Sequence, residues 1–456
     1  MLMRIIRSKW KLFFYGMGAM GVNMLNLIVG SYLCDALMTE GFATEVEYWT
    51  YSNTTLVVAG IWSVLIMLSK ILDGLIDIPL ASFADNLKSK WGRRRPALVL
   101  GLIPMILAYI GFLNPIAGPV KSLVNTIWCG VMLCIFYSFY TLTMGTYYAT
   151  FSEIVDNDGD RLSLSNFKTV FDIVYYVMGY ALIPLMISAR INIRIVGYIF
   201  LPLVLLMLIP ISLIKEPSSL DKDRNDAQKK EIHVGMVQSF KYCIANKSFV
   251  IWMVIYCFLQ FGLQIYITGQ NVYYSGIMNL QGFQMTILMA CVYAPVPFTL
   301  ILYNRIVRKR GLRTGYLFSL SAFIVAMVFM LICRADILKD VTLRLVVAAI
   351  GSVISSFGIG CFFSINYTVP SSLADAEYRQ TGITHPTMFF AVQGLSSAIA
   401  TAIATGPVWV NLKGAGLTWL LPVVAIAGTA ASFGLTFLLP KELGMIGKTP
   451  DKDQAG

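Results

Sequence analysis

The sequence predicts an all-α membrane protein of twelve transmembrane helices, arranged as two six-helix bundles with both chain ends in the cytoplasm. Hydrophobic residues make up 57% of its 456 residues, and charged residues only 13%. Apolar runs without a single charge, such as 196–214 and 317–333, recur from one end of the chain to the other. As helices, runs of this length cross a hydrocarbon core of about 30 Å. A soluble protein has no place for so many of them, so we exclude that class.

The expected spans alternate with short polar loops. They cover residues 12–37, 54–85, 97–114, 122–150, 164–188, 194–214, 247–272, 283–304, 315–333, 342–368, 384–408 and 415–440. The longest polar stretch, 215–246, is charged and rich in helix breakers, which predicts a cytoplasmic linker between the sixth and seventh spans. The predicted domains are therefore an N-terminal bundle (1–214), this linker, a C-terminal bundle (247–440) and a cytoplasmic tail (441–456).

Lysine and arginine predict the orientation. With both ends inside, the cytoplasmic segments hold 27 of these residues and the external loops hold 7, while Lys70 lies within a span. This split follows the positive-inside rule. The net charge of +11 therefore reflects membrane topology and does not indicate nucleic-acid binding. The first apolar run is too long for a signal-peptide core, so we expect it to be a membrane helix.

Nothing in the sequence indicates catalytic chemistry. The eight cysteines fall mainly within the spans, without a CxxC pair or a His/Cys cluster at metal-ligand spacing. The sequence has no Walker loop, no nucleotide-binding glycine fingerprint and no catalytic-triad spacing. We therefore expect no enzyme and no cofactor, and we exclude transport driven by ATP.

Two carboxylates, Asp73 and Asp77, lie within the otherwise apolar second span. Their spacing places them on one helical face, with Lys70 about one turn earlier. A charge at mid-bilayer costs about 2.5–3.5 kcal/mol on insertion scales, so such residues normally face a cavity or a partner. The two acids repel each other, so something positive should lie beside them: Lys70, a proton or a bound cation. We predict a cation site here, the only position at which we expect a metal such as sodium.

The basic segment KSKWGRRRP (88–96) follows the second span. Two interpretations stay open: the bases hold this loop inside during insertion, or they form an inner gate. In the second, Arg93, Arg94 and Arg95 bridge to acids or helix C-termini of the other half. A similar loop, YNRIVRKRGLR (303–313), follows the second span of the second half. Two six-helix halves with matching basic loops are typical of the major facilitator transporters.

Together, the D-x3-D pattern of the second span and KWGRRRP resemble the glycoside–pentoside–hexuronide:cation symporter family, whose best-known member is melibiose permease. The resemblance continues at YGMGAMG (15–21), DNDGDRLSLSNFK (156–168) and LADAEYRQTG (373–382), so it covers essentially the whole chain. It implies the major facilitator fold, with a sugar bound between the halves. It also implies that Asp73 and Asp77 bind the coupling cation, which is sodium, lithium or a proton.

The resemblance implies five substrate-binding residues, although the charged sugar site is not fully retained. Asn23 replaces a first-helix aspartate, and Gln393 replaces an eleventh-helix lysine. The remaining three are Tyr140, Tyr148 and Lys168. Tyr140 matches a tyrosine, Tyr148 matches an aromatic residue that packs on the sugar ring, and Lys168 lies near a fifth-helix arginine.

Independently of the resemblance, the fourth span has the composition of a pocket wall, because aromatic rings and hydroxyl groups alternate over three helical turns. Sugars suit this mixture, since their axial hydrogens stack on rings while their hydroxyls need donors and acceptors. Polar residues that satisfy one another between packed helices are the alternative. In the same way Lys168 and Asp172, four residues apart, could serve only to neutralise one another.

We therefore expect cation-coupled symport of a sugar or glycoside by alternating access. Ile76 and Met144 replace oxygen ligands that the family uses. Sodium wants roughly five or six oxygens, whereas a proton needs one acid, so we expect protons to be preferred. A facilitator or exchanger of another small solute, and a membrane sensor or scaffold without transport, stay open. The expected partners are a small solute and the lipid bilayer, for a monomer in a bacterial inner membrane.

Overall fold

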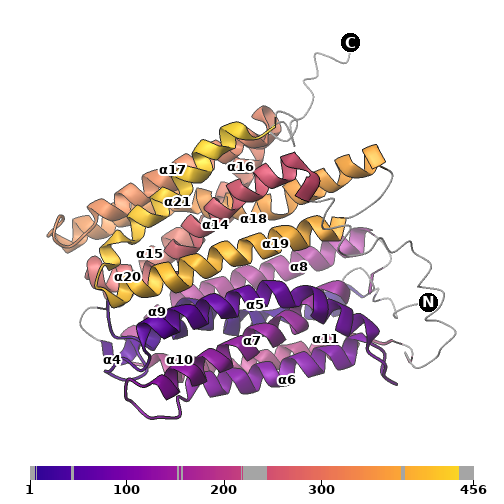
Figure 1. Cartoon of the computed structure of the whole chain (residues 1–456), viewed down its shortest axis with the longest axis horizontal. Helices are drawn as coiled ribbons and strands as arrows, with labels where there is room; N and C mark the ends of the chain where they lie inside the picture. Colours follow the sequence, from indigo (N-terminus) through magenta and orange to yellow (C-terminus); the bar gives the residue numbers. More distant parts are fainter. Residues whose placement is uncertain are drawn as a thin grey trace. The chain divides into compact units, whose positions relative to one another are not determined.

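The computed structural model describes residues 6, 8–42, 46–150, 154–155, 158–216, 218, 244–381 and 386–440. Throughout these residues the regular structure is helical, without a strand. The chain divides into two compact units, Met1–His233 and Val234–Gly456 (Figure 1). Their boundary falls within the stretch predicted to be a linker, most of which lies outside the described residues, as does the predicted tail.

Twelve helical stretches of the described chain are long and apolar enough to cross a membrane, as predicted. They are Lys9–Ala36, Ala59–Ile76, Arg94–Leu113, Leu123–Ala149, Val170–Ser188, Ile193–Leu213, Lys247–Ile277, Phe283–Arg310, Leu312–Ile332, Val341–Gly360, Val392–Gly414 and Thr418–Leu438. Large apolar side chains remain exposed along them, for example Leu107 at 63% and Phe298 at 75%. Exposed apolar surface of this kind suits contact with lipid, whereas in water it would promote aggregation.

The N-terminal unit contains eleven described α-helices, several of them pieces of one span. They are α1 (Lys9–Met17), α2 (Ala19–Ile28), α3 (Cys34–Ala36), α4 (Val46–Trp49), α5 (Ala59–Asn86), α6 (Arg94–Leu113), α7 (Leu123–Ala149), α8 (Asp158–Val177), α9 (Ile183–Ser188), α10 (Ile193–Phe200) and α11 (Leu208–Leu213). Two π-helical segments, η1 (Val29–Leu33) and η3 (Met178–Leu182), interrupt the first and fifth spans. A 3-10 segment with a proline near its start, η4 (Leu201–Met207), joins α10 to α11.

The C-terminal unit contains α14 (Lys247–Val272), α15 (Phe283–Tyr293), α16 (Val296–Arg310), α17 (Leu312–Ile332), α18 (Val341–Thr381), α19 (Pro386–Ile403), α20 (Asn411–Gly414) and α21 (Leu421–Leu435). Two π-helical segments, η5 (Tyr273–Ile277) and η6 (Ala404–Val410), continue α14 and α19. Short 3-10 turns, η7 (Thr418–Leu420) and η8 (Thr436–Leu438), flank α21.

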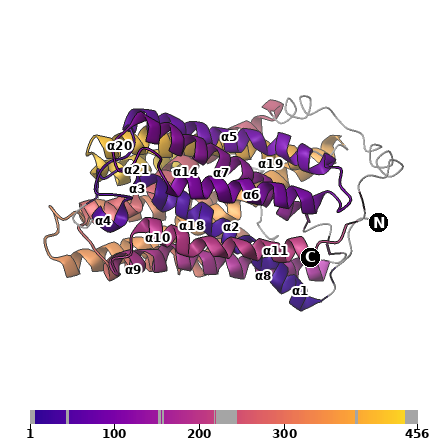
Figure 2. The ribbon, with the colours of Figure 1, turned by 90° about the horizontal axis from the view of Figure 1, so that it is seen from below.

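Both units pack their six spans in the same way. In the N-terminal unit the fourth span, α7, packs against α5 and α6, while the first span packs against α8 and against η4 and α11 of the sixth (Figure 2). In the C-terminal unit the fourth span, α18, packs against α15, α16 and α17, and α14 packs against α19 and α21. The fourth span thus contacts the second and third, and the first contacts the fifth and sixth. Each unit is therefore one copy of a repeated six-helix arrangement.

The glycines of YGMGAMG bring the first span close to the sixth. A Cβ atom at Gly21 would lie 2.0 Å from the backbone oxygen of Leu203. A Cβ atom at Gly18 would lie 2.2 Å from the Pro210 side chain. Small residues of this kind allow membrane helices to approach closely. The motif is therefore a packing surface within the N-terminal unit.

Helix ends and predicted span ends differ at several places. The second helix begins at Ala59 and not near residue 54, because Val58 is extended. The fifth helix begins at Asp158, ahead of the predicted span, and the tenth continues to Thr381, well past it. Hydropathy predicts the part of a helix that lies in lipid, whereas the backbone hydrogen-bond ladder continues into polar sequence.

Candidate functional site

Two neighbouring residues of α7 hydrogen-bond to two different helices. The Tyr140 hydroxyl donates to Asn23 Oδ1 on α2 over 3.1 Å. The Thr141 hydroxyl donates to Asp73 Oδ1 on α5 over 2.6 Å. Successive helical residues point about 100° apart, so one helix can serve two neighbours at the same height. In this way α7 joins a group of polar residues to a partly buried carboxylate.

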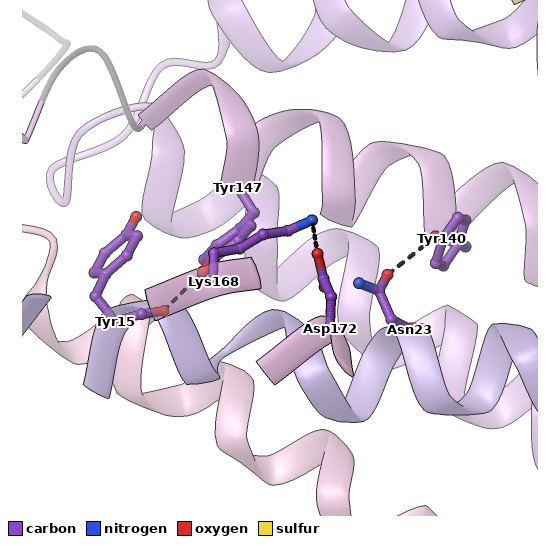
Figure 3. A network of polar contacts seen from close by, with 6 residues as sticks. All are labelled: Tyr15, Asn23, Tyr140, Tyr147, Lys168 and Asp172. Carbon is purple, nitrogen blue, oxygen red and sulfur yellow. Dashed lines mark hydrogen bonds and ion pairs between the residues drawn. The ribbon is translucent and has the colours of Figure 1, made fainter. Parts of the chain in front are cut away.

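The group on the Asn23 side consists of Asn23, Tyr140, Tyr148, Lys168 and Asp172, from α2, α7 and α8; we call it the polar cluster. Lys168 and Asp172 form a close ion pair. The Lys168 ammonium also lies 5.2 Å from the centroid of the Tyr148 ring. Figure 3 shows the ion pair beside Asn23, whose amide nitrogen faces Asp172 while its oxygen accepts from Tyr140. The sequence resemblance pointed to four of these five residues, and the structure brings them together.

The polar cluster is electrically balanced and partly open. Its one positive and one negative charge are paired, which offsets part of the cost of holding them inside a membrane protein. The Lys168 and Asp172 side chains are 23% and 22% exposed, and Tyr148 is 41% exposed, whereas Asn23 is buried. The cluster therefore presents a ring, an ammonium group and a carboxylate that a small molecule could reach.

The second group lies between α5 and α7 and contains Lys70, Asp73, Tyr137 and Thr141. The Lys70 ammonium lies 3.6 Å from the centroid of the buried Tyr137 ring, and its charge also acts on Asp73. Two contacts therefore join α5 to α7 about one helical turn apart. Lys70 contacts Tyr137, and Asp73 accepts a hydrogen bond from Thr141. Asp77 belongs to the same helix, but its side chain lies outside the described residues.

The sequence analysis did not predict that Tyr137 and Thr141 contact the polar residues of the second span. The spacing of these residues nevertheless hinted at the contacts. Lys70 and Asp73 are three residues apart on one helix, and Tyr137 and Thr141 are four apart on another, so each pair is spaced by about one turn. Which turns face each other depends on the packing of α5 on α7, which spacing alone does not give.

A second set of contacts ties the first span to the C-terminal end of α7. The Tyr147 hydroxyl donates to the Tyr15 carbonyl oxygen over 2.7 Å (Figure 3), and the two rings stack with centroids 5.4 Å apart. The Tyr15 hydroxyl in turn contacts the Thr150 hydroxyl. These contacts hold α1 against α7 just beyond the polar cluster, so they position α2 and Asn23.

Gln393, the fifth expected substrate residue, lies in the C-terminal unit. It is buried, and its side-chain oxygen accepts a hydrogen bond from the Trp252 indole over 2.8 Å. The bond links α19 to α14. A role for Gln393 in substrate binding stays a prediction.

The three expected gating arginines lie at the start of α6, with Arg93 just before its first residue. They contact the end of the sixth span and Glu216 just after it. Glu216 accepts hydrogen bonds from the backbone amides of Arg93 and Arg94, each over 2.7 Å. The Arg95 guanidinium donates to the carbonyl oxygens of Ile211 and Ser212 over 2.8 and 3.0 Å. A carboxylate at one helix N-terminus and a guanidinium at another C-terminus both match the helix dipoles. Glu216, at the start of the predicted linker, therefore anchors that stretch to the basic loop.

The corresponding loop of the C-terminal unit repeats this arrangement. Gly92 and Gly311 both have positive φ, +85° and +88°, and an arginine follows each glycine closely. As Arg95 binds the end of the sixth span, Arg313 binds the Leu439 carbonyl oxygen at the end of the twelfth. All of these contacts lie within single units. A gating role toward the other half stays a prediction.

Nearly the whole chain matches a known protein family. A family model described as "MFS/sugar transport protein" matches residues 14–439. The chain belongs to this family. It is the melibiose-permease-like family that the sequence motifs resemble, so that prediction is confirmed. The protein is therefore a multi-pass membrane transporter of small solutes and not an enzyme.

Several solved structures have the same fold as this chain. The transporter is 14% identical to the nucleoside transporter NupG, with a TM-score of 0.63, 95% of this chain and 98% of that chain being covered. A bacterial homologue of the human lysosomal transporter Spinster gives 11% identity and a TM-score of 0.62, with 98% and 99% coverage. A POT family transporter gives 14% identity and 0.59, with 95% of both chains covered. At such identities these structures establish the fold alone. No curated protein matches the sequence.

Proposed function

We propose that this transporter carries a sugar or glycoside across the membrane by alternating access, coupled to a cation. The observation that carries the proposal is the pair of hydrogen bonds from Tyr140 and Thr141, which joins the polar cluster to Asp73. In the proposal both chain ends lie in the cytoplasm, and the protein acts as a monomer in a bacterial inner membrane.

The chemistry of the polar cluster supports an uncharged solute. Tyr148 offers an accessible ring face for the apolar side of a sugar, and Asn23 and Tyr140 offer an amide and a hydroxyl for its polar side. The Lys168–Asp172 pair adds a charged donor and a charged acceptor without a net charge. In the proposal Gln393, from the C-terminal unit, also binds the solute. Arg93, Arg94 and Arg95 would form the gate that closes the transport path on the cytoplasmic side.

The cation would bind at Asp73 and Asp77. A proton needs only one acceptor oxygen, whereas sodium needs several, and Ile76 and Met144 supply none in their side chains. We therefore propose that protons are preferred. Each charge moved inward with the membrane potential makes about 2.3 kcal/mol per 100 mV available for uptake.

A second candidate function is facilitated transport without a coupled cation. The observation that favours it is Lys70, a positive charge of the protein itself that acts on Asp73. If Lys70 alone balances Asp73 throughout the transport cycle, no external cation is needed.

Counterflow and gradient-driven uptake in proteoliposomes test both candidates. We expect exchange of a neutral glycoside from a panel, and concentrative uptake that is driven by a pH gradient and lost in Asp73→Asn and Asp77→Asn. Counterflow without concentrative uptake under either a pH or a sodium gradient would favour the facilitator. Uptake driven by sodium and indifferent to pH would contradict the proton preference. Exchange of no sugar or glycoside would contradict the solute class.

A further inference from the structure

Lys70 has a defined position between α5 and α7. Its ammonium group lies 3.6 Å from the centroid of the Tyr137 ring, and Tyr137 is 2% exposed. An ammonium over an aromatic face is attracted by the ring electrons, most strongly where water is excluded. The buried ring therefore holds the positive charge of the partly buried Lys70 between α5 and α7.

Asp73 is held from the same helix, about one turn further on. Thr141 donates to one carboxylate oxygen over 2.6 Å, so that oxygen already has a hydrogen-bond partner within the protein. Thr141 and Tyr137 lie one turn apart on α7, just as Asp73 and Lys70 do on α5. The carboxylate and the ammonium are thus fixed relative to each other by two cross-helix contacts, and their charges interact.

We infer that Lys70 is a tethered cation that excludes sodium from Asp73, so that removal of its charge opens a sodium site. A metal ion beside Asp73 would meet the repulsion of the ammonium group and would compete with it for the carboxylate charge. It would also need about five or six oxygens, and the Lys70 side chain beside Asp73 supplies none. A proton bonds to the carboxylate oxygen itself and needs no other ligand. The inference rests on the proposed function in taking Asp73 as the cation-binding group.

The test uses the full-length protein and sodium itself as the probe. Thermal unfolding is measured in sodium chloride and in choline chloride of equal ionic strength, for wild type, Lys70→Gln and Lys70→Arg. We expect no sodium-specific shift for wild type or Lys70→Arg. For Lys70→Gln we expect a rise of roughly 2 °C or more, the size that follows when sodium is present at about ten times its dissociation constant.

A double variant, Lys70→Gln with Asp73→Asn, should lose the sodium response, because the carboxylate is then absent. Lys70→Met serves as a second uncharged replacement if Lys70→Gln does not fold. A sodium response in wild type as large as in the uncharged variants would overturn the inference. So would folded Lys70→Gln or Lys70→Met protein that responds no more than wild type. Sugar counterflow is measured separately on the same preparations, so loss of the proposed solute does not alter the sodium result.

Discussion

Tyr140 and Thr141 are consecutive residues of α7, yet their hydroxyl groups bind Asn23 on α2 and Asp73 on α5. A rotation or shift of α7 that improves one bond must alter the other, because both side chains leave the same turn of one rigid helix. A solute that binds Asn23 or Tyr140 can therefore change the surroundings of the carboxylate on the other side of α7. Met144, which replaces an oxygen ligand that the resembling family uses, is buried in the same helix. We therefore expect any link between the solute and the carboxylate to run through Tyr140 and Thr141.

Replacing Thr141 by valine should change the ion dependence of uptake. The valine keeps the shape but removes a hydrogen bond to a charged group, worth about 1.5–3 kcal/mol. The ionised carboxylate then loses a stabilising donor and binds a proton more tightly. We expect the pH dependence of proton-driven uptake to move toward alkaline pH by about one unit or more. Uptake into proteoliposomes at a series of external pH values measures the shift.

Thr143→Val is the matched control for that experiment. Thr143 lies on the same helix, but its hydroxyl donates to the Phe139 carbonyl oxygen of its own helix. The control should leave the pH profile where it is in wild type. Equal shifts in both variants would show that the effect comes from α7 as a whole and not from the bond to Asp73.

Asp172→Asn should change which solutes the transporter accepts. The substitution leaves the Lys168 charge without its partner, so an anionic sugar such as a uronide gains a charge to pair with. We expect a uronide to compete roughly tenfold better against a neutral glycoside than it does in wild type. The measurement is competition in counterflow. The neutral double variant Lys168→Gln with Asp172→Asn should return to the wild-type preference, and unchanged competition in Asp172→Asn would count against a solute beside this pair.

Substitutions of Tyr148 should separate its ring from its hydroxyl. Tyr148→Phe keeps the exposed ring face, and Tyr148→Leu removes it. If a sugar stacks on this ring, Tyr148→Leu should weaken solute affinity by roughly tenfold, and Tyr148→Phe by much less. Equilibrium binding of the transported glycoside gives both values. Equal losses of affinity in the two variants would show that Tyr148 binds the solute through its hydroxyl group and not through its ring.

Gly92→Ala should destabilise the N-terminal unit more than Gly118→Ala. Both glycines have positive φ, +85° and +74°, so an alanine is strained at either position by about 1–2 kcal/mol. Only at Gly92 does a new Cβ also collide, at 2.3 Å, with the Glu216 side chain, whereas nothing lies within 4 Å at Gly118. The difference in thermal unfolding temperature between the variants isolates this contact. Equal temperatures would show that Glu216 moves aside freely.

The sequence by itself determined the class of the protein. The number of spans follows from hydropathy. Every backbone polar group in lipid must be hydrogen-bonded within its own helix, so each span is a continuous helix. A run of about 20 apolar residues is enough to identify such a helix in the sequence. The predicted family followed from the acids of the second span and the basic loop after it. These features are local in the chain, so they can be read without knowing how the helices pack. Asn23 and Tyr140, expected at one site from the resemblance, do meet in the structure.

Only the tertiary structure decided which side chains are partners. The contacts of Thr141 with Asp73, of Lys70 with Tyr137 and of Glu216 with the basic loop join residues 67 or more positions apart in the sequence. Such contacts depend on the rotation and height at which one helix packs on another. Rotation and height come from the sum of many small packing interactions along the whole interface, such as the close approach at Gly21, and no single motif encodes them. For that reason the arginine loop, predicted from charge alone, proved to bind the end of the sixth span in its own unit.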